Sequence, residues 1–328
     1  CLEPSIMSIY RNTVWFAKGL REYTKSGFER ASKNFTSSDL DCSCSGKTAL
    51  VTGANSGIGK CISLELAKKG AVVHMVCRNS SAAEAAKQEI VKASNNQNIN
   101  IHILDLSKPK EVIKFVKDFA NSSSALDILV NNAGCMVHEH TLDADGLEVN
   151  FATNTLAPHI FVTHLSALLK KSDGSRVVTV SSGGMLVQKL NYDDLQFLKM
   201  KTFDGTMAYA QNKRQQVVLN ELYAKMYPEI HFSCMHPGWA DTPAVRTAMP
   251  QFHSMMGDRL RSPEQGADTA IWLAVSDAAK ALPSGLFFQD RAPVPTHLPL
   301  AWTKSTEEEN QRLLSQLDDI MKKLVPDS

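Results

Sequence analysis

The sequence lacks a long hydrophobic run, a disulfide pattern and an excess of charge of one sign. No uninterrupted apolar stretch reaches the about 18 residues of a spanning helix, so no membrane span is expected. The 35 basic and 34 acidic residues leave a net charge of +1, which excludes nucleic acid as the expected partner. Seven scattered cysteines, an odd number, favour a reducing, cytoplasmic compartment. Cys42 and Cys44 are too close together, and lack a matching pair, for a metal site.

The first residues predict a helix that leaves two interpretations open. The chain begins at Cys1, and Met7 is a more natural start for the native protein. After it, apolar and basic residues recur at helical spacing: Ile9, Val14, Phe16 and Leu20 with Arg11, Lys18, Arg21 and Lys25. The segment 7–30 could lie on a membrane surface, which would make the protein membrane-associated, or pack against its own domain. We favour packing, because such stripes usually serve it.

From residue 47 onward, short β-rich runs alternate with helical stretches. The expected strands are 48–52, 71–77, 99–104, 126–130, 176–180, 230–234 and 285–288. The longest expected helices lie around 146–170 and 208–226. This alternation predicts an α/β protein with a doubly wound parallel-sheet Rossmann fold, as a single domain over 47–300. An N-terminal helical extension (1–46) precedes it, and a C-terminal helix (301–328) begins near Thr306, which has capping-box spacing with Glu309.

The first strand ends in a glycine-rich turn at which a helix begins. Its candidate cofactor residues are Gly53, Asn55, Ser56, Gly57, Ile58 and Gly59. Three glycines there let backbone N–H groups approach a pyrophosphate, and the helix N-terminus favours its negative charge. The spacing is GxxxGxG rather than GxGxxG, and a plain tight turn would also use glycine.

Cofactor choice depends on the end of the second strand, where NAD sites place an acidic residue. Arg78 stands there, with no Asp or Glu between Gly70 and Asn79, and Lys60 adds a second charge nearby. A guanidinium pairs with a 2′-phosphate, so NADP is the expected cofactor. The alternative is that Arg78 is an ordinary solvated residue.

Two further strand ends supply candidate cofactor residues. Asp105, followed by Leu106, could accept a hydrogen bond from the adenine amino group, or could cap the next turn. Asn132, Ala133 and Gly134 follow the fourth strand, where ligands of open α/β sheets bind. A tight turn would explain them as well.

The candidate catalytic residues are Tyr209 and Lys213, which share one face of a helix. A phenol pKa near ~10 is too high for a base at neutral pH, and the lysine charge is expected to lower it. This spacing is also a common chance pairing. Ser181 and Ser182 end a strand and could donate to a substrate carbonyl, or form an ordinary serine turn. Asn154 lies in mid-helix, against its propensity, which points to function.

Taken in order, these motifs resemble those of the short-chain dehydrogenases/reductases over about 47–290. The matching positions are 52–59, 131–134, Asn154, Ser182, Tyr209 with Lys213, and 237–242. The resemblance implies that Tyr209 is the acid/base and that Lys213 holds the nicotinamide ribose and tunes Tyr209. It implies that Ser182, with Tyr209, binds the substrate oxygen. Asn154 would support a water in the proton relay, while Pro237, Gly238 and Thr242 would line the nicotinamide side.

Two departures from the family bear on the substrate. The 26 residues between Ser182 and Tyr209 exceed the number in shorter members, which suggests an insertion at the rim of the site. Residues 155–158, Thr-Leu-Ala-Pro, replace the His-Leu-Gly-His of many retinol-type members, which weakens any inference of retinoid specificity.

The expected activity is hydride transfer between NADP(H) and a carbonyl or alcohol. A partly apolar small molecule is the expected substrate, because a flexible lid over the site could be formed by Met249, Phe252, Met255 and Met256. Core packing explains these residues equally well. The alternative function is a non-enzymatic NADP-binding or scaffolding protein on the same fold. The resemblance implies that the helices at 146–170 and 208–226 are where relatives commonly pair, which leaves a homo-oligomer open as an alternative to a monomer.

Overall fold

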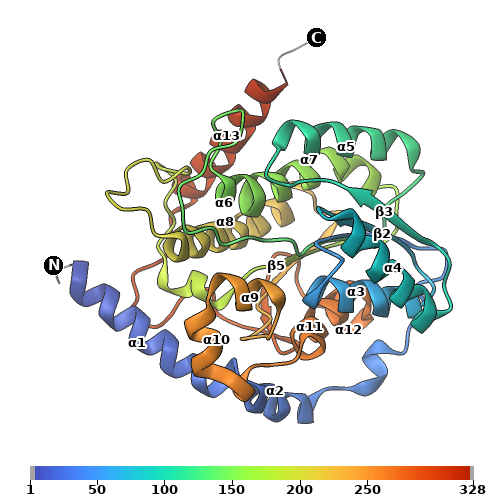
Figure 1. The fold of residues 1–328 in the computed structure, drawn as a ribbon, viewed down its shortest axis with the longest axis horizontal. Helices are drawn as coiled ribbons and strands as arrows, with labels where there is room; N and C mark the ends of the chain where they lie inside the picture. The colour runs from blue at the N-terminus through green and yellow to red at the C-terminus, as the bar shows by residue number, and fades with distance from the viewer. Residues whose placement is uncertain (1–3, 326–328) are drawn as a thin grey trace.

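The computed structural model describes residues 4–325, which form one twisted sheet flanked by helices (Figure 1). The strands are β1 (Thr48–Thr52), β2 (Val72–Cys77), β3 (Ile99–Ile103), β4 (Ile128–Asn131), β5 (Arg176–Val180), β6 (His231–Met235), β7 (Phe287–Gln289) and β8 (Ala292–Pro293). Their order is β3-β2-β1-β4-β5-β6-β7-β8, parallel except for the antiparallel pair β7–β8. The order reverses between β1 and β4, the place where such sheets bind ligands.

Helices cover both faces of the sheet, as the doubly wound fold requires. They are α1 (Pro4–Glu22), α2 (Lys25–Ala31), α3 (Gly57–Lys68), α4 (Ser80–Ser94), α5 (Pro109–Ser122), α6 (Val149–Phe151), α7 (Ala157–Leu169), α8 (Gly205–Met226), α9 (Pro243–Ala248), α10 (Pro250–Met256), α11 (Pro263–Val275), α12 (Asp277–Lys280) and α13 (Glu307–Leu324). One core lies under α3, α4 and α11, and the other under α5, α7 and α8. The α/β prediction is confirmed.

Short helical turns complete the chain: η1 (Ser32–Asn34), η2 (Ser37–Leu40), η3 (Ala152–Leu156), η4 (Gly183–Val187) and η5 (Gly257–Arg259). The helix expected over 146–170 is interrupted by η3, which is a π-turn. Such turns occur frequently at functional sites, because they displace a backbone segment from the regular helix. This one contains Asn154.

The N-terminal extension lies against the domain through one face of α1. Tyr23 is fully buried, and a Cβ added to Gly19 would lie 2.3 Å from Cζ2 of Trp239. The inner face of α1 therefore packs against the domain, whereas Ile9, Phe16 and Leu20 on its outer face stay partly or largely exposed. Over residues 4–325, no helix combines the length and hydropathy needed to cross a bilayer.

The C-terminal helix α13 begins with the expected capping box, in which Thr306 and Glu309 each accept a backbone hydrogen bond from the other. It then packs across α7 and α8. Leu313 and Leu317 are fully buried, and Oδ1 of Asp318 lies 3.1 Å from Nε2 of His159. Part of the surface expected to pair with a second copy is thus covered by the protein's own helix, and pairing there stays a prediction.

Candidate active site

The glycine-rich turn between β1 and α3 has a backbone that only glycine accommodates without strain. Gly53 and Gly57 have φ angles of +65° and +50°. A Cβ at Gly59 would lie 2.2 Å from the carbonyl oxygen of Gly53 and 2.4 Å from Nδ2 of Asn132. The turn therefore packs directly on the end of β4, and its amides are brought close to the surface where a pyrophosphate would lie.

The segment after β4 is fixed to β1 by side-chain hydrogen bonds. Nδ2 of Asn132 donates to the carbonyl oxygen of Thr52 at 2.8 Å. The hydroxyl of Thr52 accepts from the amides of Asn132 and Ala133, both at 3.0 Å. Asn132 thus ties the ends of β1 and β4 together, and it fixes the position of the backbone that leads to Gly134.

Arg78 lies at the end of β2, where the sequence places the cofactor determinant. Its side chain is exposed, and it forms no ion pair within the described residues. Burial raises the pKa of the Cys135 thiol, and the positive charge of Arg78 is among the groups that oppose this rise. Lys60, in contrast, is paired with Glu89, which neutralises the second charge expected there.

Asp105 adopts the turn-capping arrangement. Its Oδ1 accepts from the amide of Ser107 at 3.0 Å and from the Ser107 hydroxyl at 2.8 Å. The following residue, Leu106, is buried. An additional contact with adenine stays a prediction.

Tyr209 and Lys213 project from α8 toward the end of β4. Nζ of Lys213 lies 5.3 Å from the Tyr209 ring centroid and donates to the carbonyl oxygen of Val180 at 2.9 Å. A Cβ at Gly134 would lie 3.5 Å from the same Nζ. The phenol and the ammonium therefore share one face of the helix and lie beside the cofactor cradle.

The charge states of this pair differ from the sequence-based expectation. Burial raises the pKa of Tyr209 to about 12, and a hydrogen bond with Ser182 only partly opposes it. Burial also lowers the pKa of Lys213 to about 8. The prediction that Lys213 lowers the Tyr209 pKa is wrong for this state of the site. Loss of solvation is the largest effect on the phenol, and Lys213, which donates to the Val180 carbonyl, is not among the groups that lower its pKa.

The two serines at the end of β5 have separate roles. Ser181 is buried, and its hydroxyl donates to the backbone carbonyl of Lys213 at 3.0 Å. Ser182 is less buried; its Oγ accepts from the Gly184 amide at 3.2 Å and also interacts with Tyr209. Ser182 is therefore the serine that interacts with the phenol, and its role toward a substrate oxygen stays a prediction.

Asn154 is held inside the π-turn by a network that the sequence did not reveal. Its side chain accepts from the Cys135 amide at 2.9 Å and donates to the Cys135 carbonyl at 2.8 Å. Its own carbonyl accepts from Nε2 of Gln216 at 2.6 Å. Asn154 thus positions the backbone that follows Gly134, and its role in a proton relay stays a prediction. No sequence signal singled out Gln216, which lies one helical turn from Asn212 and Lys213.

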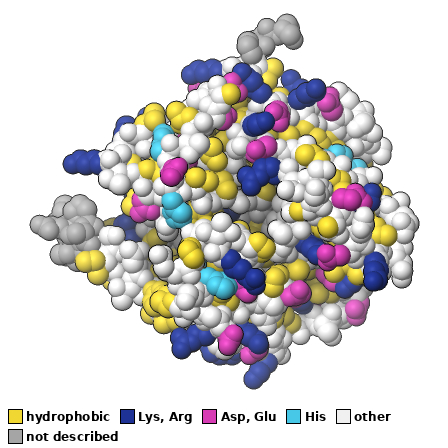
Figure 2. All heavy atoms as spheres, in the orientation of Figure 1, with side chains coloured by type: hydrophobic (Ala, Val, Ile, Leu, Met, Phe, Trp, Pro, Cys, Tyr) yellow, Lys and Arg dark blue, Asp and Glu magenta, His cyan; other side chains and the backbone are white. Residues whose placement is uncertain are grey.

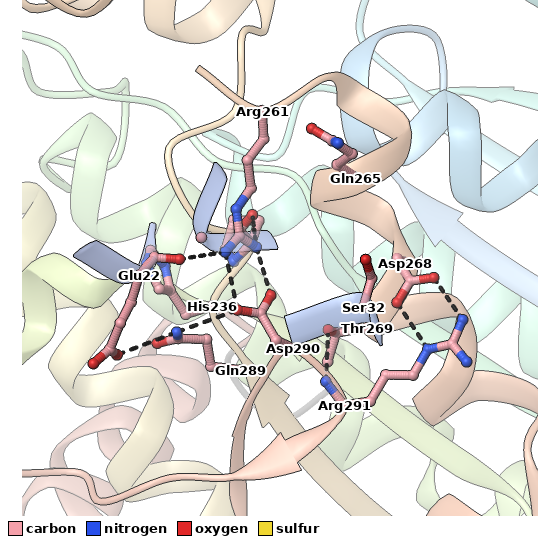
Figure 3. Close-up of polar contacts among 12 residues, drawn as sticks. Glu22, Ser32, His236, Arg261, Gln265, Asp268, Thr269, Gln289, Asp290 and Arg291 are labelled. Atoms are coloured by element: carbon pink, nitrogen blue, oxygen red, sulfur yellow. Dashed lines mark hydrogen bonds and ion pairs between the residues drawn. The ribbon is translucent and has the colours of Figure 1, made fainter. Parts of the chain in front are cut away.

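The loop after β6, which carries Pro237 and Gly238, is anchored by a buried arginine (Figure 3). Arg261 pairs with Asp290 at 2.6 and 3.0 Å and donates to the Glu22 carbonyl at 2.6 Å. Its Nη1 also lies 3.4 Å from the Pro237 carbonyl oxygen. A Cβ at Gly238, whose φ is +76°, would lie 2.3 Å from Nε of Arg261. Sequence reasoning missed Arg261.

The N-terminal extension also reaches this loop through aromatic contacts. The Trp239 amide donates to the Tyr23 carbonyl at 2.8 Å, and the Tyr23 ring lies edge-on to His236 at 4.3 Å. Nδ1 of His236 accepts from the Gly183 amide at 2.8 Å, beside Ser182. Residues near the end of α1 therefore help to position both the β5 and the β6 loop.

Thr242 begins α9, where its hydroxyl accepts from the Val245 amide at 3.3 Å. Its Cγ2 would lie 3.2 Å from a Cβ at Gly57, so the loop and the glycine turn face each other. In Figure 2 the surface is hollowed between α8 above and α9 and α11 below.

Of the four residues expected to form either a flexible lid or part of the core, two pack in the interior and two stay accessible. Phe252 packs edge-on against Trp239 at 5.2 Å, and Met256 is buried in the same cluster. These two residues serve packing. Met249 lies between α9 and α10, and Met255 is 60% exposed, so a part of this segment stays apolar and accessible.

Comparison with known proteins adds a family context. The family model described as short chain dehydrogenase matches residues 47–192. The chain is 58% identical to dehydrogenase/reductase SDR family member 12 of Bos taurus, over 97% of this chain and 99% of that protein. It is 31% identical to retinol dehydrogenase 11 of Mus musculus, covering 84% and 85% of the two chains. Among solved structures it resembles the Pseudomonas aeruginosa RhlG/NADP active-site complex, with a TM-score of 0.60 and 25% identity over 75% of this chain and 94% of that one.

Proposed function

Because the chain belongs to the short-chain dehydrogenase/reductase family, we propose that it transfers hydride between NADP(H) and a carbonyl or alcohol carbon. One observation carries the proposal: Ser182, Tyr209 and Lys213 converge beside Gly134 at the carboxyl ends of β4 and β5. This is the edge of the sheet where ligands of such folds bind.

The residues present fit a dinucleotide. Gly53 and Gly59 leave no room for a Cβ, so the turn offers backbone N–H groups rather than side chains to a pyrophosphate. Gly134 keeps the space in front of Lys213 open, where a ribose would be held. The exposed, unpaired Arg78 favours a 2′-phosphate and thus NADP. The RhlG structure, which contains NADP, supports the same choice.

The side chains divide the chemistry of carbonyl reduction among them. When bound, NADPH supplies the hydride. The Tyr209 hydroxyl then gives its proton to the substrate oxygen, and Ser182 donates a hydrogen bond to the same oxygen as negative charge develops on it. Lys213, released from the Val180 carbonyl, would hold the ribose hydroxyls and place its charge beside the phenol.

The charge states favour Tyr209 as an acid. With its pKa raised to about 12, the phenol is protonated throughout the neutral range and can donate. Below about pH 8 the Lys213 ammonium is also charged. The protonated phenol is the form that can give its proton to a substrate oxygen in carbonyl reduction.

The substrate we propose is partly apolar. On the segment that follows Thr242, Met249 is part-buried and Met255 is 60% exposed, so apolar side chains stay accessible there. An apolar surface at the entrance of a site favours apolar substrates, because they lose little solvation free energy when they leave water.

A screen of the wild-type protein tests the proposal. Ketones, aldehydes and alcohols of graded hydrophobicity are offered with NADPH, NADH and their oxidised forms, and the absorbance of the reduced nicotinamide is followed. We expect turnover with NADPH and at least one apolar carbonyl. Tight NADPH binding without turnover on any member of the screen would instead favour the non-enzymatic alternative.

A further inference from the structure

The outer face of α1 carries large apolar side chains that stay partly or largely exposed within residues 4–325. Ile9 is 66% exposed, and Phe16 and Leu20 stand on the same side of the helix, seven and eleven residues further on. The adjoining side, with Trp15 and Gly19, packs against the domain, and Phe16 reaches the Trp239 ring at the border between the two sides. Ile9 and Leu20 therefore do not serve the packing of α1 on its own domain.

A loop beside α1 adds two more exposed residues, Leu300 and Trp302, each 76% exposed. The loop is tied to the helix: the Tyr10 hydroxyl donates to the Pro299 carbonyl at 2.9 Å, and Nε of Arg11 donates to the Ala301 carbonyl at 2.7 Å. Figure 1 shows this segment running alongside α1 before the chain enters α13.

The backbone of this loop is strained in a way that displays these two side chains. Leu300 and Trp302 have φ angles of +54° and +55°, in the left-handed region that residues other than glycine seldom adopt. Between and after them, Ala301 and Thr303 point inward and are buried. Backbone strain of this kind persists only where the surrounding structure enforces it. It therefore points to a function for the exposed Leu300 and Trp302 side chains.

Helix α10 flanks α1 on the other side. Phe252 of α10 and Phe16 of α1 both contact the Trp239 ring, so the two helices share one aromatic cluster. From this cluster Met255 points outward. In Figure 2, hydrophobic side chains lie along the edge of the molecule that α1 and α10 form.

The charge of this region is positive although the protein is nearly neutral. Residues 4–31 contain five basic and two acidic side chains, in a chain whose net charge is +1. The basic residues are Arg11, Lys18, Arg21, Lys25 and Arg30, of which Lys18 pairs with Glu22. Lys304 is exposed directly after the loop, before the acidic first turn of α13. Apolar side chains surrounded by basic ones match a surface with a hydrocarbon interior and negative head groups.

We propose that Ile9, Phe16 and Leu20 of α1, together with Leu300 and Trp302, form a docking surface for an anionic phospholipid bilayer. The apolar side chains enter the interfacial region, and the basic side chains meet the lipid phosphates. Trp302 is suited to this place, because an indole combines an apolar ring with a hydrogen-bond donor and prefers the membrane interface. The surface adjoins α10, whose exposed Met255 extends the apolar area.

The test is sedimentation of the full chain with vesicles of phosphatidylcholine, with and without phosphatidylserine. We expect binding to the vesicles that contain phosphatidylserine and a decline of that binding as salt rises. The double variant Leu300→Ser/Trp302→Ser should lower the affinity about tenfold or more, because two large apolar groups no longer leave water. The matched control is Leu198→Ser, which changes an exposed leucine of the 188–204 loop that is not part of the proposed surface and should bind like wild type.

A second measurement uses tryptophan emission. Trp239 and Trp272 are buried and Trp15 is half-buried, so Trp302 should dominate any blue shift on vesicle binding, and Trp302→Phe should remove it. Absent binding, equal binding to both vesicle types, or an equal loss in Leu198→Ser would overturn the proposal. Self-association that the double variant abolishes, without vesicle binding, would identify a second copy as the occupant and would also overturn it. None of these readouts depends on catalysis.

Discussion

Replacing Lys213 by methionine should abolish activity and yet stabilise the fold. Lys213 is 2% exposed, and no carboxylate forms an ion pair with it among residues 4–325. Burial lowers its pKa from 10.5 to about 8. Since one pKa unit corresponds to about 1.4 kcal/mol, holding this ammonium charged in the folded protein costs about 3 kcal/mol. Lys213→Met removes that cost and keeps most of the side-chain volume.

The gain is reduced by the lost hydrogen bond to the Val180 carbonyl, worth about 1 kcal/mol. We therefore expect the free energy of unfolding at pH 7 to rise by about 2 kcal/mol. Below pH 8 the lysine is protonated in both the folded and the unfolded protein, so the wild type bears the full cost. Between about 8 and 10.5 it is protonated only when unfolded, so the cost fades, and above 10.5 it is absent.

Urea unfolding at pH 7 and at pH 10.5 measures this difference. The advantage of Lys213→Met over wild type should be present at pH 7 and much smaller at pH 10.5. Lys213→Arg is the control, because it keeps a charge at this position at both pH values. A variant less stable than wild type at pH 7 would refute the reasoning that the buried ammonium is retained for function at the expense of stability.

Three further experiments test separate parts of the site. Arg78→Asp should lower the ratio of kcat/KM for NADPH over NADH by about tenfold to a hundredfold, and an unchanged ratio would reject the 2′-phosphate contact. Ser182→Ala should reduce kcat about a hundredfold, whereas Ser181→Ala should leave kcat near wild type and destabilise the fold by about 1 kcal/mol; equal kinetic losses would contradict the assignment. Arg261→Gln should destabilise the fold by about 3 kcal/mol and raise the KM for NADPH, because the Pro237 loop loses its anchor. Arg246→Gln, which breaks an exposed ion pair, is its control, and matching losses of thermal stability would refute the anchor.

The parallel strands and most crossover helices were predictable from the sequence. Their apolar runs are short and end at Gly, Asn or Ser, so the hydrophobic pattern and the turn-forming residues indicate the same strand ends. Helix α11 was missed although Ser262 and Gln265 form a capping box at its start. That signal could have revealed the helix. The strand β8 spans only two residues and leaves no pattern to find.

The candidate catalytic residues could be predicted from the sequence, but the residues that hold them in place could not. Asn154 stood out because asparagine is unfavourable in mid-helix, and the π-turn explains why it is tolerated there. Arg261 could not be foreseen, because its partner Glu22 is 239 residues away along the chain. The pKa of Tyr209 was misjudged because spacing reveals the neighbouring charge, whereas the larger effect is burial, which only the fold determines.

The central claim is that the Tyr209 hydroxyl transfers the proton, and Tyr209→Phe tests it most directly. With a carbonyl that the wild type reduces, single-turnover oxidation of bound NADPH is compared in the two proteins, and NADPH affinity is measured by fluorescence titration. The account predicts NADPH affinity within about threefold of wild type and a rate lower by about a thousandfold or more. A Tyr209→Phe protein that oxidises NADPH at a rate close to that of wild type would contradict it.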